Sequence, residues 1–454
     1  MSPLEWIDAQ RDFLLSELVE FLKFPSVSAQ PKHRADLHAT AEWLKRYLEA
    51  LGFTVELLEE PPVVHAYYDG PAGAPTVLFY GHYDVQPPEP FELWESPPFS
   101  PRIHNGAIYA RGACDDKGQV YGHLAAWRYL HQRYGRLPLS IHVVIEGEEE
   151  TGSDTLYRVL KAHGPKWRSD VALVSDTAFF SESIPTLTVG LRGLIYTEVI
   201  VRGAQRDLHS GSFGGVAPNP AIALAQIIAA LKNPDGRITI PGFYDEVRKI
   251  DPAERALWQN LPADEAHYER LMGSPATGGE VGFAPLERIG SRPTLDVNGM
   301  VSGYIGEGSK TIIPAEAKAK ISMRLVPNQN PQHIWTQYKA YVESLAPPGV
   351  SVDVRLLHEP APAFETPTDS IFYKIAEEAI TEAFGKRPIP IREGGSIPVL
   401  SALREAIGGA PVILMGFGLP SDAVHSPNEH FQLRQLWGGI HAAIRFYEGA
   451  AKHA

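Results

Sequence analysis

The chain of 454 residues contains a single cysteine, Cys114, so it cannot form an internal disulfide. This excludes small secreted domains held together by disulfides, and so few thiols are typical of a reducing compartment. Because Cys114 directly precedes Asp115, a redox or nucleophilic role is one interpretation. The other is a small residue filling a tight turn. No histidine lies close by in the sequence to activate the thiol, which favours the turn.

Long apolar runs and an excess of positive charge are also missing. No run approaches the roughly 20 apolar residues that a membrane span requires. In residues 1–26, acidic residues interrupt the apolar positions at helical spacing, which predicts an amphipathic helix and not a signal peptide. The formal net charge of -13 argues against nucleic acid or an anionic membrane as the main partner, because each requires a basic face. We therefore predict a cytoplasmic protein.

Helix and strand patterns alternate over residues 1–188 and resume after residue 363. Short, continuously apolar runs are typical of strands buried on both faces of a parallel sheet. These runs are Thr76–Tyr80, Leu139–Ile145, Val171–Ser175 and Pro411–Met415. Helical patterns accompany them at Asp36–Leu51, Gly118–Tyr134 and Ser370–Phe384. The alternation predicts an α/β fold with a mostly parallel sheet flanked by helices.

The middle of the chain, residues 189–363, follows a different pattern. Alternating strands and helices there predict a small ferredoxin-like (split βαβ) sheet with its helices on one face. The predicted elements are Leu194–Val201, Asn219–Leu231, Lys318–Leu325, Asn330–Leu345 and Val350–Leu357. A polar stretch, Pro234–Pro293, has the character of an insertion of unknown role. We therefore predict a discontinuous catalytic domain, residues 1–188 and 364–454, interrupted by a second domain.

Side chains that can bind metal follow the buried strands. His82 follows the first apolar run, Glu149 and Glu150 follow the second, Asp176 follows the third, and His425 comes soon after the last. Ligands of an open α/β sheet gather beyond the carboxyl ends of its strands. Imidazoles and carboxylates in that position indicate a site for divalent cations.

Three local patterns favour such a site, although each has a plainer alternative. His82 and Asp84 lie two residues apart, so the carboxylate could orient a ligating imidazole; an incidental turn histidine is the alternative. Asp115 lies in a turn flanked by glycines that could aim both oxygens at two cations, or it could cap a helix. Glutamates 148–150 repel one another unless cations or protons offset their charge, or they form a solvated surface run.

Taken together, the motifs resemble those of a known family. They are GHYDVQP, ARGACDDKG, EGEEETGS, VSDT, LRGLIYTEV with DLHSG, TIIPAEAKAKISMRLVPN, REGGSIP and HSPNE, in this order. The chain is similar to the co-catalytic zinc peptidases: cytosolic non-specific dipeptidases, carnosinases, glutamate carboxypeptidase, acetylornithine deacetylase and succinyl-diaminopimelate desuccinylase. REGGSIP and RLVPN are most similar to the cytosolic dipeptidase branch.

The resemblance implies a centre of two divalent cations, Zn²⁺ or else Mn²⁺ or Co²⁺, that share Asp115. One cation would be held by His82, Asp115 and Asp176, and the other by Asp115, Glu150 and His425. Glu149 matches the general base, and Asp84 matches the residue that orients the ring of His82. The resemblance gives Glu148 no role, and it implies a cis peptide bond between Asp115 and Asp116.

For the middle domain, the resemblance implies a lid that also forms a homodimer. His209 resembles the histidine that reaches the active site of the partner subunit and polarises the scissile carbonyl, and Arg324 the arginine that grips the C-terminal carboxylate of the substrate. Thr311, Ser396 and Gly395 resemble further substrate contacts. The segment FETPTDS, at the junction back to the catalytic domain, departs from the pattern, because some dipeptidases have a histidine there. Which residues contact the terminal carboxylate of the substrate is therefore left open by the resemblance.

We therefore predict a two-metal hydrolase of peptide or amide bonds, a dipeptidase that cleaves small peptides with a free C-terminal carboxylate. An N-acyl-amino-acid deacylase or a carboxypeptidase of the same family is the first alternative. A non-catalytic member that only binds in its cleft is the second, and the presence of every predicted ligand and of the base speaks against it.

Overall fold

The computed structural model describes residues 1–453, which form two compact units. The first unit comprises Met1–Val189, Thr366–Ile391 and the described residues from Val399 onward, and the second comprises Gly190–Glu365 and Arg392–Pro398. The sequence pattern predicts that residues 392–398 belong to the second part of the catalytic domain. The structure groups them with the second unit, because contacts of Arg392 tie this segment to it.

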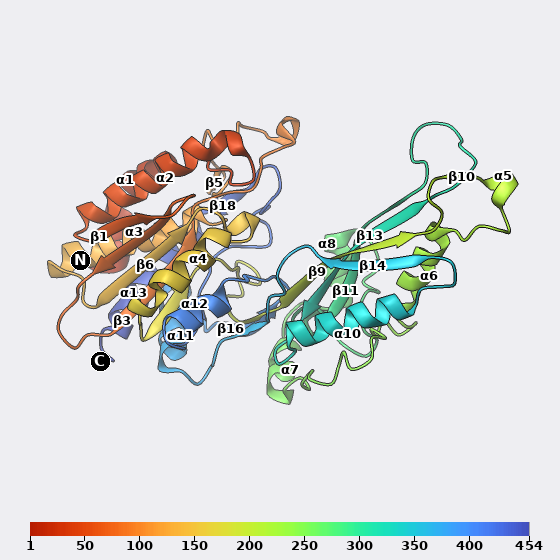
Figure 1. The fold of residues 1–454 in the computed structure, drawn as a ribbon. Coiled ribbons are helices and arrows are strands. Elements are labelled where there is room, and N and C mark those ends of the chain that lie inside the picture. The colour runs from red at the N-terminus through yellow and green to blue at the C-terminus, as the bar shows by residue number, and fades with distance from the viewer. Residues whose placement is uncertain (454) are drawn as a thin grey trace. The chain divides into compact units, whose positions relative to one another are not determined.

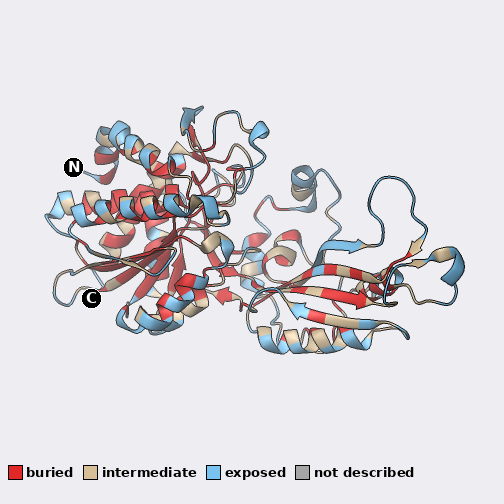
Figure 2. Ribbon diagram, turned by 45° about the horizontal axis from the view of Figure 1, so that its top comes forward, coloured by how far each residue is buried: buried red, intermediate tan, exposed pale blue. Residues whose placement is uncertain are grey.

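A large, mostly parallel sheet forms the centre of the first unit, as predicted (Figure 1). Seven of its nine strands, in spatial order, are β1 (Thr54–Leu58), β2 (Val63–Tyr68), β6 (Ser140–Glu146), β3 (Thr76–His82), β7 (Val171–Val174), β17 (Val412–Leu414) and β8 (Thr186–Leu191). β3 pairs in parallel with β6 and β7, and β17 pairs in parallel with β7, whereas β1, β2 and β8 run antiparallel to their neighbours. Every residue of β6 is buried, so both faces of the sheet are covered (Figure 2).

One face of the sheet belongs to a continuous apolar core, and helices flank the sheet. They are α1 (Pro3–Leu22), α2 (Arg34–Ala50), α3 (Lys117–Tyr134), α4 (Asp154–His163), α11 (Ile371–Phe384), α12 (Leu400–Ala406) and α13 (Leu433–Ala450). α3 packs against α1 and α13, and α11 packs against α13, whereas α4 packs against α12. A small antiparallel sheet of β4 (Arg102–His104), β5 (Ala107–Tyr109) and β18 (His430–Gln432) completes the unit. Among residues 1–453, no helix has both the length and the apolar character needed to cross a membrane.

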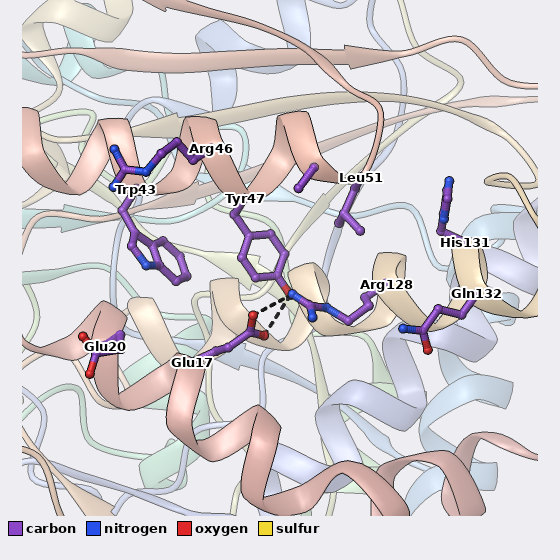
Figure 3. A pocket seen from close by; sticks show the side chains of 10 residues that line it. Glu17, Glu20, Trp43, Arg46, Tyr47, Leu51, Arg128, His131 and Gln132 are labelled. Atoms are coloured by element: carbon purple, nitrogen blue, oxygen red, sulfur yellow. Dashed lines mark hydrogen bonds and ion pairs between the residues drawn. The ribbon is translucent and has the colours of Figure 1, made fainter.

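Helices α1, α2 and α3 enclose a surface pocket that contains a partly buried ion pair (Figure 3). The Nη2 atom of Arg128 lies 2.7 Å from Oε1 of Glu17, and the hydroxyl of Tyr121 donates to Oε2 of the same carboxylate at 3.0 Å. The carboxylate of Glu17 thus has both a charged partner and a hydrogen-bond donor. Its lining contains none of the residues predicted for the functional site.

The second unit is built on a four-stranded antiparallel sheet in the order β11-β13-β9-β14. The strands are β9 (Gly193–Arg202), β11 (Thr294–Ser302), β13 (Glu316–Leu325) and β14 (Ser351–Leu356), and the helices that pack on them are α6 (Pro220–Ala230) and α10 (Pro331–Ser344). With a chain order of βαββαβ, this is the predicted ferredoxin-like arrangement. Asn330 caps α10, accepting hydrogen bonds from the N–H groups of Gln332 and His333.

Side chains alternate along β13, so the sheet has one helix-covered face and one helix-free face. Ile321 and Met323 are buried in the core that also holds Tyr338 of α10. Ser322 and Arg324 point to the opposite face and are half-buried. Arg324 therefore projects from the side of the sheet that α6 and α10 leave uncovered.

The strand β11, which directly follows the polar stretch, was not predicted. Its sequence, TLDVNGMVS, is exposed over most of its length, because β11 is the outer strand of the sheet. A strand exposed on both faces carries no apolar alternation, which is the signal that sequence reasoning uses. The chain before it forms α7 (Pro252–Trp258), α8 (Glu265–Met272) and α9 (Pro285–Gly290).

The same stretch holds the returning segment 392–398 in place. Arg392 is buried and donates to Glu254 of α7 from Nε at 3.1 Å and Nη2 at 2.8 Å, and its Nη2 also donates to Glu365 at 2.6 Å. A side chain on Gly290 of α9 would come within 2.4 Å of the carbonyl oxygen of Arg392. The helices of the polar stretch therefore fix the start of the REGGSIP motif. Short strands β15 (Phe364–Glu365) and β16 (Ile389–Glu393) lie next to these boundaries in the chain.

Candidate metal centre and substrate residues

The central sheet delivers the predicted ligands from the ends of its strands. His82 is the last residue of β3, Asp176 follows β7, and Glu149 and Glu150 lie in a short 3₁₀ turn, Glu149–Thr151, shortly after β6. Because β3, β6 and β7 are parallel neighbours, their carboxyl ends meet at one edge of the sheet. The continuous apolar runs place these residues at that edge, where the chain leaves the sheet.

Asp115 lies between two histidines at this edge. Nε2 of His82 is 2.9 Å from Oδ1 of Asp115, and Nε2 of His425 is 2.9 Å from its Oδ2. The peptide bond from Asp115 to Asp116 is cis, as the resemblance implied. Gly118 allows this turn to close, because a Cβ there would lie 1.9 Å from the carbonyl oxygen of Ala113.

The five predicted ligands form two groups that share Asp115. The first is His82, Asp115 and Asp176, and the second is Asp115, Glu150 and His425; within each, the candidate ligand atoms lie within 4.8 Å of one another. Nε2 of His82 is 3.9 Å from Oδ2 of Asp176, and Nε2 of His425 is 3.3 Å from Oε2 of Glu150. The tertiary fold thus brings together residues from five separate parts of the chain.

Asp84 connects the two sides of this site and is fully buried. Nδ1 of His82 lies 3.0 Å from the main-chain oxygen of Asp84 and 3.4 Å from Oδ1 of its carboxylate. That carboxylate also accepts the N–H groups of Glu149 and Glu150, each at 3.1 Å. One side chain therefore fixes both the ring of His82 and the turn that carries the two glutamates.

The donor set fits divalent cations. Nδ1 of His82 donates its hydrogen to Asp84, so Nε2 carries a lone pair. This lone pair points at the carboxylate oxygens of Asp115 and Asp176. Lone pairs that face one another repel unless a cation or a proton lies between them. Oε1 of Glu150 is buried and has no hydrogen-bond partner among residues 1–453. Two imidazoles and three carboxylates suit Zn²⁺ or Mn²⁺.

The protein alone leaves the charges of the site unbalanced. Burial, together with repulsion from Glu150, Asp115 and Asp84, raises the pKa of Glu149 to about 8. Hydrogen bonds to Asp115 and Glu150 raise the pKa of His425 to about 10. Carboxylates crowded in this way stay protonated to higher pH, because protonation reduces their mutual repulsion. A bound cation reduces the same repulsion, so such a group of acids favours cation binding.

Sequence reasoning missed Glu429, which holds the loop that carries Asp115. Its buried carboxylate accepts hydrogen bonds from the N–H groups of Gly112, Cys114 and Asp115 at 3.0 to 3.1 Å, and from Nη1 of Arg111 at 2.7 Å. The HSPNE motif contains Glu429, but its partners lie more than 300 residues earlier in the chain. Only an acidic residue inside a family motif was visible in the sequence.

Two residues left open by the sequence now have structural explanations. Oε2 of Glu148 accepts the N–H of Thr155 at 2.8 Å in the first turn of α4, so Glu148 stabilises a helix terminus. Cys114 is buried, and its Sγ lies 3.4 Å from Oδ2 of Asp422. Burial, reinforced by Asp422 and Glu429, raises the pKa of the Cys114 thiol well above its ordinary value. This supports the interpretation of Cys114 as a residue that fills a turn.

Three of the predicted substrate residues, Arg324, Ser396 and Gly395, lie together in the second unit. Nη1 of Arg324 donates to Oγ of Ser396 at 2.7 Å, and Oγ of Ser396 donates to the carbonyl oxygen of Arg192. The N–H of Arg192 donates to the carbonyl oxygen of Gly395 at 2.9 Å. The REGGSIP segment is thus linked to Arg324 through hydrogen bonds.

His209 and Thr311 form a second, exposed group in this unit. His209 ends β10 (Leu208–His209), which pairs with β12 (Ile312–Ile313), and the N–H of Ser210 donates to the carbonyl oxygen of Thr311 at 3.1 Å. Nδ1 of His209 accepts the N–H of Gly211 at 3.0 Å and so caps the short helix α5 (Ser210–Phe213). An imidazole that accepts at Nδ1 carries its hydrogen on Nε2, so His209 presents a donor to solvent.

Comparison with known proteins gives matches along nearly the whole chain. Residues 78–449 match the family described as Peptidase family M20/M25/M40. The Cys-Gly metallodipeptidase dug1 of Schizosaccharomyces pombe is 31% identical, covering 96% of this chain and 95% of that protein. The Beta-Ala-His dipeptidase of Rattus norvegicus is 29% identical, with 94% and 90% covered. The solved structure of the M20 family metallo-carboxypeptidase Sso-CP2 from Sulfolobus solfataricus has a TM-score of 0.86 at 31% identity, covering 97% of this chain and 99% of that one.

Glu429 should be needed for tight binding of metal, because its carboxylate holds the loop that carries Asp115. Glu429→Gln removes the carboxylate that holds the Asp115 loop, so affinity for Zn²⁺ or Mn²⁺ should fall about 10- to 100-fold, the usual effect of losing a group that orients metal ligands. Calorimetric titration of metal-free protein measures this affinity. Glu17→Gln is the control, because it also breaks an Arg–Glu pair, in this case a partly buried one, but Glu17 contacts none of the ligands. A folded Glu429→Gln protein with unchanged cation affinity would contradict the role.

Proposed function

The chain belongs to peptidase family M20/M25/M40, and from this membership and the two ligand groups we propose that it hydrolyses dipeptides with two divalent cations bound. The family is one of metal-dependent peptidases, so the resemblance inferred from the motifs is confirmed. One observation carries the proposal: Nε2 of His82 and Nε2 of His425 face opposite oxygens of Asp115. A carboxylate placed in this way can be shared by two cations.

In this proposal the five ligand residues hold the cations. His82 and Asp176 complete one site around Asp115, and Glu150 and His425 complete the other. When bound, divalent cations supply Lewis acidity, which makes a water nucleophile available near neutral pH and polarises the scissile carbonyl. We propose that the bound cations are Zn²⁺; the same ligands also accept Mn²⁺ or Co²⁺.

Glu149 acts as the base. It is not needed for either ligand group, yet the hydrogen bonds of Asp84 fix its backbone beside Glu150. From there its carboxylate takes a proton from the attacking water and later gives it to the leaving amine. Asp84 acts through other residues, because it holds the ring of His82 and the turn of Glu149 in place.

The substrate we propose is a small peptide with a free C-terminal carboxylate. Arg324 is the residue for that carboxylate, because a guanidinium offers paired donors to a carboxylate. Relatives named as dipeptidases for Cys-Gly and for Beta-Ala-His support a dipeptide. The similar structure described as a metallo-carboxypeptidase keeps that activity as the second candidate, and an N-acyl-amino-acid deacylase would use Arg324 in the same way.

We further propose that the protein forms a homodimer through the second unit. Within the described part of the chain, no strand pairs with the outer edge of β11, and its Val297, Met300 and Val301 are exposed. Exposed apolar edge strands are a liability in a monomer, whereas a second copy can pair with such an edge. His209 would then donate from Nε2 to the substrate carbonyl in the partner's site. The single cysteine supports our placement of the enzyme in the cytoplasm.

Replacing the base separates catalysis from metal binding. Glu149→Gln keeps all five ligands, so cation content should stay at the wild-type level, while kcat falls about 10²- to 10⁴-fold through loss of general base catalysis. Elemental analysis of the dialysed protein and a dipeptide hydrolysis assay measure the two quantities. Near-normal turnover by this variant would disprove the role of Glu149.

A substrate screen tests the function itself. Metal-free protein should be inactive, and reloading with Zn²⁺, Mn²⁺ or Co²⁺ should restore hydrolysis of free dipeptides. N-acetylated amino acids and N-blocked dipeptides serve as comparison substrates, because a deacylase or carboxypeptidase accepts them and a dipeptidase prefers a free amine. Preference for the blocked substrates would indicate a carboxypeptidase or an N-acyl-amino-acid deacylase. Binding without any cleavage would indicate a non-catalytic member.

Co-expression of two inactive variants tests whether His209 acts across a dimer. In a hybrid of Glu149→Gln and His209→Ala subunits, one site combines an intact Glu149 with an intact His209 from the partner. Random pairing makes half of the dimers hybrid, so about a quarter of wild-type activity should return. No recovery, or a fully active monomer by light scattering, would contradict the dimer. Each variant expressed alone is the control.

A further inference from the structure

Two arginines lie side by side on the helix-free face of the sheet in the second unit. Arg324 extends from β13, opposite Thr294 of β11. Arg192 immediately precedes β9, and its Nη1 lies 3.4 Å from Oγ1 of Thr294. Both guanidinium groups are half-buried. Of these two arginines, the resemblance assigned a substrate contact to Arg324 and no role to Arg192.

Hydrogen bonds fix both side chains but leave most of their donors available. Arg324 uses Nη1 to reach Oγ of Ser396 at 2.7 Å, and Arg192 uses Nε to reach the carbonyl oxygen of Gly394 at 3.0 Å. Ser396 in turn donates to the main-chain oxygen of Arg192. A guanidinium has five N–H donors, so each arginine keeps several for a ligand. The two guanidinium groups are therefore held in position before a ligand binds.

The protein does not neutralise this pair. Among residues 1–453, neither arginine forms an ion pair with a carboxylate. Asp296 is the acid whose charge both arginines sense, but it is exposed and lies 3.8 Å from Nζ of Lys232. Burial, followed by repulsion from Arg324, lowers the pKa of Arg192 to about 10. Partly buried charges without a partner are unfavourable, so an anion should bind there.

We propose that Arg192 and Arg324 together select peptides whose C-terminal residue is acidic. Arg324 binds the main-chain carboxylate, and Arg192 binds the side-chain carboxylate of an aspartate or glutamate. This assignment rests on the proposed peptidase function and names the substrate class of the same site. Arg192 is thereby a residue that determines specificity.

Charge and geometry both favour two carboxylates over one. A single carboxylate neutralises one guanidinium and leaves the other without a counter-charge. Bidentate pairing uses two parallel N–H groups of one arginine, so two arginines match two carboxylates. Ser396 accepts from Arg324, and the carbonyl oxygen of Gly394 accepts from Nε of Arg192, so the same segment holds both guanidinium groups. The positive charge of the second guanidinium favours a side-chain carboxylate over its uncharged, isosteric amide.

The isosteric pair Ala-Glu and Ala-Gln tests the proposal with the metal-loaded full-length protein. The wild type should cleave Ala-Glu with a kcat/KM about tenfold or more above that for Ala-Gln, because a charge-assisted pair in a half-buried site is lost with the amide. Arg192→Gln should reduce this ratio at least fivefold. Arg192→Lys keeps the charge without the fork and should retain part of the preference.

Lys320→Gln is the matched control. Lys320 lies on β13 four residues before Arg324, on the same face, and is exposed, so its removal tests the general charge of that face. It should leave the ratio unchanged. A wild-type ratio near one, or the same ratio in the wild type and in Arg192→Gln, overturns the proposal. Cleavage of both peptides at equal rates would leave the peptidase function intact, whereas cleavage of neither would contradict that function itself.

Discussion

The placement of one carboxylate between two imidazoles is the constraint on which the functional part of this molecule depends. Asp115 presents Oδ1 to His82 and Oδ2 to His425, both at 2.9 Å. Because the two ligand groups share this residue, a displacement of its loop disturbs both at once. Glu429 holds the main chain of that loop through three N–H groups, and Asp84 holds the ring of His82. Two buried carboxylates thus hold the candidate ligands in position.

Crowding these carboxylates in a buried site reduces the stability of the metal-free protein. Asp176 and Glu149 lie among other carboxylates, and burial with mutual repulsion raises the pKa of each. The rest of the first unit provides the rigidity that keeps these groups together: a sheet buried on both faces and one continuous apolar core. Cations bound by deprotonated ligands would return much of this free energy, so metal binding and stability should be linked.

The proposed substrate arginines and the candidate metal ligands belong to different units of the chain. The second unit contains the arginines, and the ligand residues belong to the first. The segment Arg392–Pro398 brings Ser396 to Arg324, although the neighbouring sequence on both sides belongs to the first unit. The polar stretch before β11, which had no apparent role, anchors this segment through the ion pair of Glu254 and Arg392.

Much of the architecture could be predicted because burial leaves a pattern in the sequence. The runs Thr76–Tyr80, Leu139–Ile145 and Val171–Ser175 correspond to β3, β6 and β7, and the alternation at Lys318–Leu325 corresponds to β13. β11 was missed because an exposed outer strand has no such pattern.

The sequence by itself determined the five candidate metal ligands, four from their positions after apolar runs and Asp115 from its motif. Only the tertiary structure decided how they meet: that two histidines face opposite oxygens of Asp115, and that Arg192 joins Arg324. It alone also assigned the partners of Glu429, which lie more than 300 residues away. Periodicity records whether a side chain is buried, whereas the identity of its partner depends on contacts between distant segments, which no local pattern encodes.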